Sequence, residues 1–209
     1  MLQAEFIYHI YNHANGNENL FRIDENYRYF LEKYNFYISP IAYTYCYCLM
    51  PNHFHLLIKI KPVKDIIQNS TWEKFQLNKN IQRLESMPKE ELFAKFLSQQ
   101  FSNLFNSYSK SYNKMYNRKG SLFIPRFKFK LIDNENYYTR IIHYIHANPI
   151  HHNFVTKIED WKWSSYSSFF SAKKTQLNKK DVVDWFGNIE EFKLAHKMNY
   201  DLSFANLLE

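Results

Sequence analysis

Three runs of β-branched and aromatic residues in the first third of the chain predict strands. They cover residues 6–11, 41–50 and 53–61. In the last run the side chains alternate with a period of two, so it has one apolar face and one face that carries two imidazoles. The apolar face holds Phe54, Leu56, Ile58 and Ile60, and the other holds His53, His55, Leu57 and Lys59.

Helical spacing of apolar residues follows in two longer segments. Residues 25–35 come after a potential N-cap at Asp24. Residues 91–117 repeat large apolar side chains every three or four positions, up to a glycine stop at Gly120. The basic and aromatic stretch 121–131 then reads as a strand or an extended arm.

A third helix is predicted over residues 134–147, capped by Asp133 and ending before Pro149. The order strand, helix, strand, strand, helix, strand, helix is typical of an α+β fold, in which helices pack against an antiparallel sheet. We expect a main domain over 1–171, with a polar or helical insertion near 62–118. Residues 172–209 change in character and are predicted to be a C-terminal extension.

The composition of the chain limits the classes of function that it can have. The 209 residues carry a net charge of +7, which fits a polyanionic partner such as nucleic acid, although many basic proteins bind none. Only three glycines occur, which excludes Walker and dinucleotide-binding loops. Cys46 and Cys48 lie two apart on a predicted strand, so we expect buried thiols rather than a disulfide. Neither a signal peptide nor a membrane span is recognisable, and we expect a cytoplasmic location.

His53 and His55 are candidate metal ligands. On a strand, residues two apart have Cα atoms roughly 6.5–7 Å apart and project to one face, which a single ion can bridge. Two surface histidines on a half-exposed strand remain the alternative.

The helix at 134–147 offers possible partners for these histidines. About 100° per residue places a stripe of Tyr137, Ile141, Tyr144 and Asn148 beside the presumed core stripe of Tyr138, Ile142 and Ile145. Tyr144 and Asn148 are one turn apart and can reach the same point, whereas His143 and His146 face away. Ordinary packing of Tyr144 remains the alternative.

Two motifs resemble the signatures of insertion-sequence-200-like transposases, most closely the REP-associated tyrosine transposases. They are LMPNHFHLLIKI at 49–60 and IIHYIHANPI at 141–150. Supporting stretches are YHIYNHANGN at 8–17, KGSLFIPRFK at 119–128 and WKWSSYSSF at 161–169. The resemblance spans roughly residues 5–170.

This resemblance implies a ferredoxin-like or RRM-like sheet and the chemistry of a single-tyrosine HUH endonuclease. His53 and His55 match the histidine pair that holds Mg²⁺ or Mn²⁺, and Asn148 matches the third ligand. Tyr144 matches the nucleophile that forms a 5′-phosphotyrosine. The implied partner is single-stranded DNA with a hairpin, and both a monomer and a homodimer stay open. The base that activates Tyr144 is not identified.

Basic residues between the two motifs are candidates for phosphate contacts, with alternating aromatics for the bases. They are Lys110, Lys114, Arg118, Lys119, Arg126, Lys128, Lys130 and Arg140. Two other functions stay open: a non-catalytic DNA- or RNA-binding module of the same fold, and a metal-dependent nuclease without a covalent intermediate.

Overall fold

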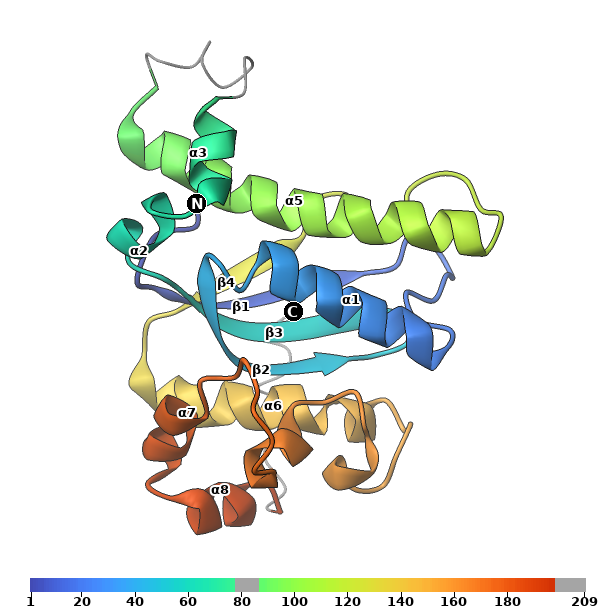
Figure 1. Cartoon of the computed structure of the whole chain (residues 1–209). Helices are drawn as coiled ribbons and strands as arrows, with labels where there is room; N and C mark the ends of the chain where they lie inside the picture. Colours follow the sequence, from blue (N-terminus) through green and yellow to red (C-terminus); the bar gives the residue numbers. More distant parts are fainter. Residues whose placement is uncertain (78–86, 198–209) are drawn as a thin grey trace.

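A four-stranded antiparallel sheet with helices on both faces forms the centre of the molecule (Figure 1). The computed structural model describes residues 1–77 and 87–197. The strands are β1 (Ile7–His13), β2 (Ala42–Leu49), β3 (His53–Ile60) and β4 (Lys128–Ile132). The helices are α1 (Asp24–Tyr37), α2 (Val63–Ile67), α3 (Ser70–Gln76), α5 (Lys89–Met115), α6 (Tyr138–His151), α7 (Lys179–Phe186) and α8 (Ile189–Ala195).

The strand order β2-β3-β1-β4 is that of a split βαβ unit followed by a second helix and strand. Every neighbouring pair of strands is antiparallel. The predicted α+β class and ferredoxin-like sheet are therefore confirmed.

The alternation along β3 divides the molecule into two cores. The face of Phe54, Leu56, Ile58 and Ile60 packs against α1 and α5. Leu57, on the opposite face, belongs to a second core that includes α6, α7 and α8. Figure 1 shows α1 and α5 on one side of the sheet and α6 with the C-terminal helices on the other. The two histidines of β3 therefore lie under α6.

The region 62–118 contains more regular structure than its polar composition indicates. The short helices α2 and α3 lead towards α5, and the Trp72 ring of α3 lies 5.0 Å from that of Phe96. The insertion therefore joins the core on the α5 face. Residues 78–86, which belong to the same predicted insertion, lie outside the described residues.

Helix α6 departs from the prediction at both ends. A 3₁₀ turn, Glu135–Tyr137, precedes it, so Asp133 does not cap a helix from residue 134. Pro149 lies inside the helix, which continues to His151. A proline in a last turn removes one backbone donor, and the nearby His152 and Phe154 amides still bond to the Asn148 and Pro149 carbonyls. The predicted end before Pro149 is therefore wrong.

The stretch 121–131 is not one continuous strand. Regular pairing is limited to β4, while Phe123 makes an isolated bridge with Ala14. Arg126 interrupts the extended backbone with a positive φ of 66°. This break changes the direction of the backbone between the residues before Arg126 and those after it.

The C-terminal segment packs on the back of α6. Val182 of α7 and Phe192 of α8 are both fully buried in the core that α6 shares with the sheet. Two 3₁₀ helices, Ile158–Asp160 and Tyr166–Phe170, complete this layer. The boundary near residue 171 stays a prediction, and residues 198–209 of the predicted extension lie outside the described residues.

Cys46 and Cys48 are free and buried, as the two-residue spacing predicts. Among the described residues, no helix is both long and apolar enough to cross a membrane.

Candidate functional site

Strand β3 directs His53 and His55 to the face that α6 covers. Both side chains are almost completely buried, and their ring centroids lie 5.1 Å apart. The expectation that they share a face is confirmed. The alternative of two surface histidines is wrong, because α6 closes this part of the sheet.

Asn148 connects α6 to both histidines. Its Oδ1 lies 2.9 Å from Nε2 of His53, and its Nδ2 lies 3.3 Å from Nε2 of His55. The carboxamide is also buried. The structure thus brings together all three residues predicted to be metal ligands.

The polarity of these contacts indicates how the ring nitrogens are protonated. His53 Nδ1 lies 2.8 Å from Oδ1 of Asn52, which only accepts, so Nδ1 carries the hydrogen. The Nε2 lone pair of His53 then faces the Oδ1 lone pairs of Asn148. Two such atoms repel each other unless a proton or a cation lies between them.

A divalent cation fits this donor set. Two ligands that are each about 2.1 Å from a cation, at right angles, lie about 3 Å apart, which is close to the 2.9 Å between His53 Nε2 and Asn148 Oδ1. No cluster of three or more His, Cys, Asp or Glu side chains with metal-binding geometry occurs among the described residues. A metal at this site would therefore depend on the Asn148 carbonyl oxygen.

Tyr144 lies against the same histidines. Its ring centroid is 5.5 Å from that of His55, edge to face, and 6.2 Å from that of His9. The residue is 6% exposed, so most of its surface is covered by the sheet and by neighbouring side chains. The predicted proximity of Tyr144 to the histidine pair is confirmed, while its role as a nucleophile stays a prediction.

Strand β1 contributes residues that the sequence reasoning missed. His9, Tyr11 and His13 share a face, and Tyr11 and His13 pair directly with His55 and His53. The His9 and His55 rings stack with centroids 5.1 Å apart, and the His13 and His53 rings with centroids 4.8 Å apart. The two-residue alternation that identified the β3 pair is also present in β1 and could have indicated them.

His9 is placed to orient His55. Nε2 of His9 lies 2.9 Å from Nδ1 of His55, and both rings are fully buried. Because Nδ2 of Asn148 donates to Nε2 of His55, the hydrogen of the His55 ring is on Nδ1, which donates to His9. This tautomer leaves the Nε2 lone pair of His55 facing Asn148 and His53.

Burial holds the pKa of His55 well below its usual range, and the imidazoles of His9, His53, His13 and His152 lower it further. His55 is therefore neutral at pH 7, which is the form that binds a metal. The same burial and the nearby His152 lower the pKa of His151, whose ring lies 5.9 Å from that of Tyr144.

A row of side chains crosses the whole sheet beside the site. Paired positions run from Cys48 through His55 and Tyr11 to Lys128. The Lys128 ammonium lies 5.6 Å from the centroid of the Tyr11 ring. Lys130 is paired with His9 in the next row, so both lysines lie on the α6 face of the edge strand.

The aromatic residues that alternate with these lysines, Phe127 and Phe129, point to the opposite face. Phe127 packs on Phe101, with centroids 4.8 Å apart, and Phe129 packs on Tyr8 at 5.9 Å. The alternation of cations and aromatics therefore separates two surfaces instead of forming one. Arg126 lies before β4 and beyond the sharp backbone change.

The remaining residues predicted to contact DNA differ in how exposed their side chains are. Arg118 bonds to Glu18 at 2.9 Å and to the Ser121 carbonyl at 2.9 Å, so its guanidinium already holds the turn after α5. Exposed side chains occur at Lys110, Lys114, Lys119 and Arg140. The role of all these residues in DNA binding stays a prediction.

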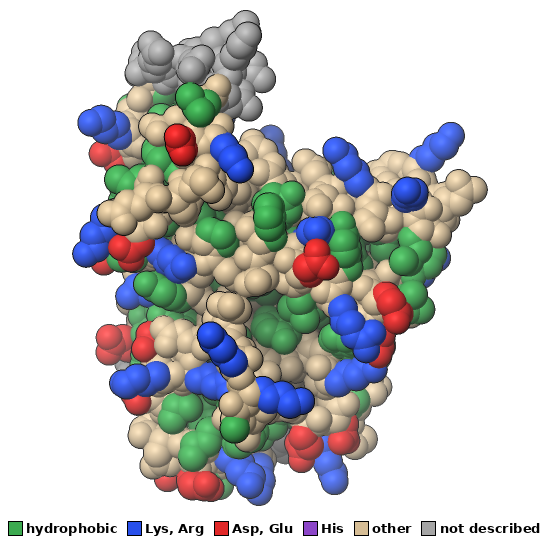
Figure 2. Space-filling model, in the orientation of Figure 1, with side chains coloured by type: hydrophobic (Ala, Val, Ile, Leu, Met, Phe, Trp, Pro, Cys, Tyr) green, Lys and Arg blue, Asp and Glu red, His purple; other side chains and the backbone are tan. Residues whose placement is uncertain are grey.

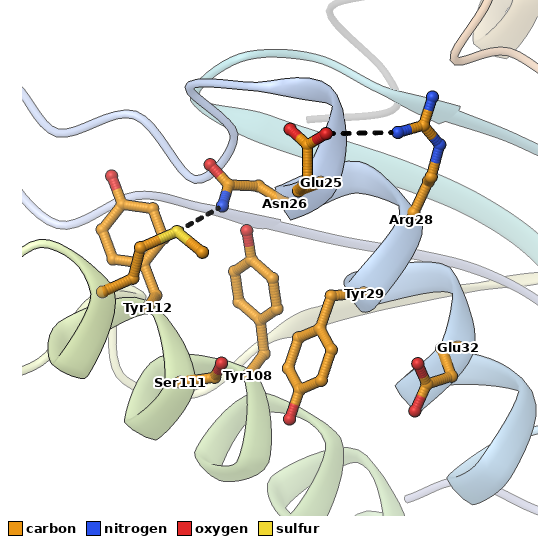
Figure 3. A pocket seen from close by; sticks show the side chains of 9 residues that line it. Glu25, Asn26, Arg28, Tyr29, Glu32, Tyr108, Ser111 and Tyr112 are labelled. Carbon is orange, nitrogen blue, oxygen red and sulfur yellow. Dashed lines mark hydrogen bonds and ion pairs between the residues drawn. The ribbon is translucent and has the colours of Figure 1, made fainter.

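Other surfaces of the molecule do not match the predicted site. A cavity of about 320 Å³ lies between α1 and α5, where Tyr29 and Tyr108 are flanked by Glu25, Arg28 and Glu32 (Figure 3). It lies on the sheet face opposite the histidines. On the face drawn in Figure 2, lysines and arginines are dispersed among acidic and apolar side chains.

The fold and site define a ferredoxin-like domain with a buried cluster of His53, His55, Asn148 and Tyr144 between sheet and helix. A similar solved structure is that of a REP-associated tyrosine transposase bound to a REP hairpin, with a TM-score of 0.53. The two chains are 14% identical, and the similarity covers 82% of this chain and 83% of that one. No protein-family model and no curated protein matches the chain. At this identity, the likeness concerns the fold.

Proposed function

We propose that the protein is a single-stranded DNA endonuclease and strand-transfer enzyme that uses Tyr144 as its nucleophile. The observation that carries the proposal is the convergence of Tyr144, from a late helix, on the His53–His55–Asn148 cluster beneath it. These are the residues that the resemblance to REP-associated tyrosine transposases singles out. The fold likeness to such a transposase supports the same function.

In this proposal Tyr144 attacks the phosphorus of a DNA phosphodiester. The bond from phosphorus to the 3′ oxygen breaks, the phenol gives up its proton and the leaving oxygen takes one up. The products are a 5′-phosphotyrosine and a free 3′-hydroxyl. Attack by a 3′-hydroxyl of another strand end reverses the step, so exchange needs no nucleotide hydrolysis.

His53, His55 and Asn148 would hold a divalent cation, Mg²⁺ or Mn²⁺. When bound, such a cation would draw electron density from a non-bridging phosphate oxygen and favour attack at phosphorus. Imidazole ligands also suit Zn²⁺, so the choice of Mg²⁺ or Mn²⁺ rests on the family resemblance. His9 keeps His55 in the ligand-competent tautomer.

The proposed substrate is a DNA strand that contains a hairpin. The transposase of similar fold is bound to a REP hairpin, and this is the reason for choosing a stem-loop as substrate. Lys128 and Lys130 flank the site on the α6 face and would contact phosphates.

The test is covalent capture of a labelled hairpin oligonucleotide, measured as a shifted band on a denaturing gel in Mn²⁺ or Mg²⁺. Tyr144→Phe removes the nucleophile and should abolish both the shifted band and cleavage. Tyr138→Phe removes the same hydroxyl from the same helix, where the ring packs 4.5 Å from Trp185, and should leave both intact.

Two other outcomes would each favour one of the alternative functions. If Tyr144→Phe still cleaves at the full rate, a nuclease without a covalent intermediate replaces the proposal. If the unmodified protein binds the hairpin tightly but never cleaves it with either metal, the chain is a binding module of this fold.

A further inference from the structure

Another cavity lies where the end of α1, strand β2 and the segment 175–177 meet. Its volume is about 180 Å³, and a cavity of roughly 150 Å³ with apolar walls is large enough to bind benzene. Leu56, which lines it, belongs to the core under α1 and α5, so the cavity is on the sheet face opposite the histidines. We call it the β2 pocket.

The walls of the β2 pocket are mostly apolar. Leu31 and Tyr34 come from α1, Tyr47 from β2 and Leu56 from β3, while Leu177 comes from the segment before α7. None of the described residues that line the pocket carries a charge. Burying an unpaired charge among such side chains is costly, so the pocket favours a neutral and largely apolar ligand.

One hydroxyl group of the pocket is available to a ligand. The Ser39 hydroxyl oxygen is buried and makes no hydrogen bond within the described part of the chain. Tyr34 Oη and Thr44 Oγ1, in the same wall, bond to each other at 2.7 Å. Buried hydroxyls are normally bonded to protein, water or a ligand, and a serine can both donate and accept. Ser39 therefore indicates a bound molecule with a polar group.

The turn that carries Ser39 is held in place by other hydrogen bonds. The Ile41 and Ala42 amides both donate to the Ile38 carbonyl at 2.9 Å. Lys61 Nζ donates to the Ser39 carbonyl at 2.6 Å. The Ser39 backbone is thus fixed before a ligand binds, which lowers the entropy cost of binding.

The segment 175–177 is attached to the outer edge of β2. Leu177 makes an isolated parallel bridge with Thr44, and the Asn178 amide donates to the Thr44 carbonyl at 2.8 Å. Thr175 and Gln176 line the pocket and are exposed, as is Asn35 of α1. The opening of the pocket therefore lies between α1 and this segment.

We propose that the β2 pocket binds a small, neutral aromatic molecule that carries one hydroxyl group. The ring lies between the tyrosine rings and the leucines, and its hydroxyl bonds to Ser39 Oγ. A ring is favoured over a flexible chain of the same volume, because it loses less conformational freedom on binding and can meet the tyrosine rings edge to face. The pocket and Tyr144 are on opposite faces of the sheet, so this inference is independent of the proposed function.

The experiment is a heteronuclear NMR titration of the full chain with phenol and with toluene. Toluene has nearly the same shape as phenol but a methyl group in place of the hydroxyl. Both probes should shift the amide signals of residues around the pocket, such as Ser39, Thr44 and Leu177, and these shifts give the dissociation constants.

Ser39→Ala should weaken phenol binding by about tenfold, as expected for the loss of one hydrogen bond. Its affinity for toluene should be unchanged or higher, because the buried hydroxyl has gone. Ser107→Ala, which removes a half-buried hydroxyl from α5, is the control and should change neither affinity. A general loss of structure would weaken both probes alike, whereas a lost hydrogen bond changes the ratio of their affinities.

A second variant fills the β2 pocket. Leu31→Phe places a larger side chain in its wall and should weaken the binding of both probes. Leu92→Phe makes the same exchange on α5, at a leucine that is also partly buried against the core, and should weaken neither.

Two outcomes would overturn the inference. If neither probe shifts the amides around the pocket, the cavity holds water only. If Ser39→Ala leaves the ratio of phenol to toluene affinity unchanged, Ser39 does not recognise the hydroxyl. Both outcomes leave the proposed function standing.

Discussion

At the scale of single residues, the site depends on which ring nitrogen carries a hydrogen. Asn52 fixes His53 with its Nε2 lone pair directed to Asn148, and His9 fixes His55 in the equivalent state. Partners of this kind normally raise the metal affinity of a histidine by orienting it. His9 is therefore expected to act as a positioning residue.

Replacing His9 tests this role. His9→Phe keeps a ring in the stack but removes the acceptor for His55, and should weaken Mn²⁺ binding by about 10- to 100-fold in calorimetric titration. His9→Gln retains a side-chain acceptor and should recover part of the affinity. Melting temperatures without metal check that both variants fold. Equal Mn²⁺ affinities for His9→Phe and the unmodified protein would exclude a positioning role.

At the scale of secondary-structure elements, β4 distributes its side chains to two surfaces. Lys128 and Lys130 face the histidine site, while Phe129 faces Tyr8 and the α5 core. Period-two alternation makes this division unavoidable once the strand pairs with β1. Arg126 does not follow this alternation, because its positive φ places its backbone outside the extended region of φ and ψ.

Lys128→Ala with Lys130→Ala should therefore weaken hairpin binding and flatten its salt dependence. Loss of two phosphate contacts on single-stranded DNA should reduce the slope of log K against log salt by about 1.4. The measurement is a set of anisotropy titrations at increasing salt. Lys173→Ala with Lys174→Ala removes two exposed lysines from the loop before α7 and serves as the control. A slope that both pairs change equally would refute a specific role for β4.

At the scale of the whole molecule, α6 lies between the sheet and the C-terminal helices. His146, on the side of α6 away from Tyr144, contacts Nε2 of His196 at 2.8 Å and Oγ of Ser165 at 2.8 Å. Ser165 in turn accepts from the Tyr47 amide of β2 at 2.9 Å. This buried chain of polar contacts ties the C-terminal segment, α6 and the sheet together.

The stability of this arrangement should depend on pH. Burial lowers the pKa of His196 to about 4 and holds that of His146 well below its usual range. Between about pH 6.5 and pH 4 the unfolded chain binds protons that the folded chain does not, so stability falls as the pH decreases.

The melting temperature should accordingly be lower at pH 5 than at pH 7.5. His196→Phe keeps a ring against Phe192, which lies 4.2 Å away in the native protein, but cannot titrate. This variant should have a smaller difference between the two pH values, even if it is less stable at both. An undiminished difference would place the origin of the pH dependence outside His196.

Much of the fold and the site core could be predicted from local patterns. Alternation in β3 placed His53 and His55 on one face, and the four-residue spacing in α6 placed Tyr144 beside Asn148. The end of α6 was misjudged, because a proline in the last turn is tolerated when nearby carbonyls find other donors. The insertion helices α2 and α3 were only partly anticipated, since five and seven residues are too few to show a helical repeat of apolar positions.

The sequence by itself determined which residues share a face, because backbone geometry sets the direction of side chains over a few residues. Only the tertiary structure decided which strand lies beside β3, and so brought His9 and His13 to the site. It also paired Arg118 with Glu18 and covered the back of α6 with His196 and Phe192. These contacts join segments far apart in the chain, and they depend on strand register and core packing that no short sequence window contains.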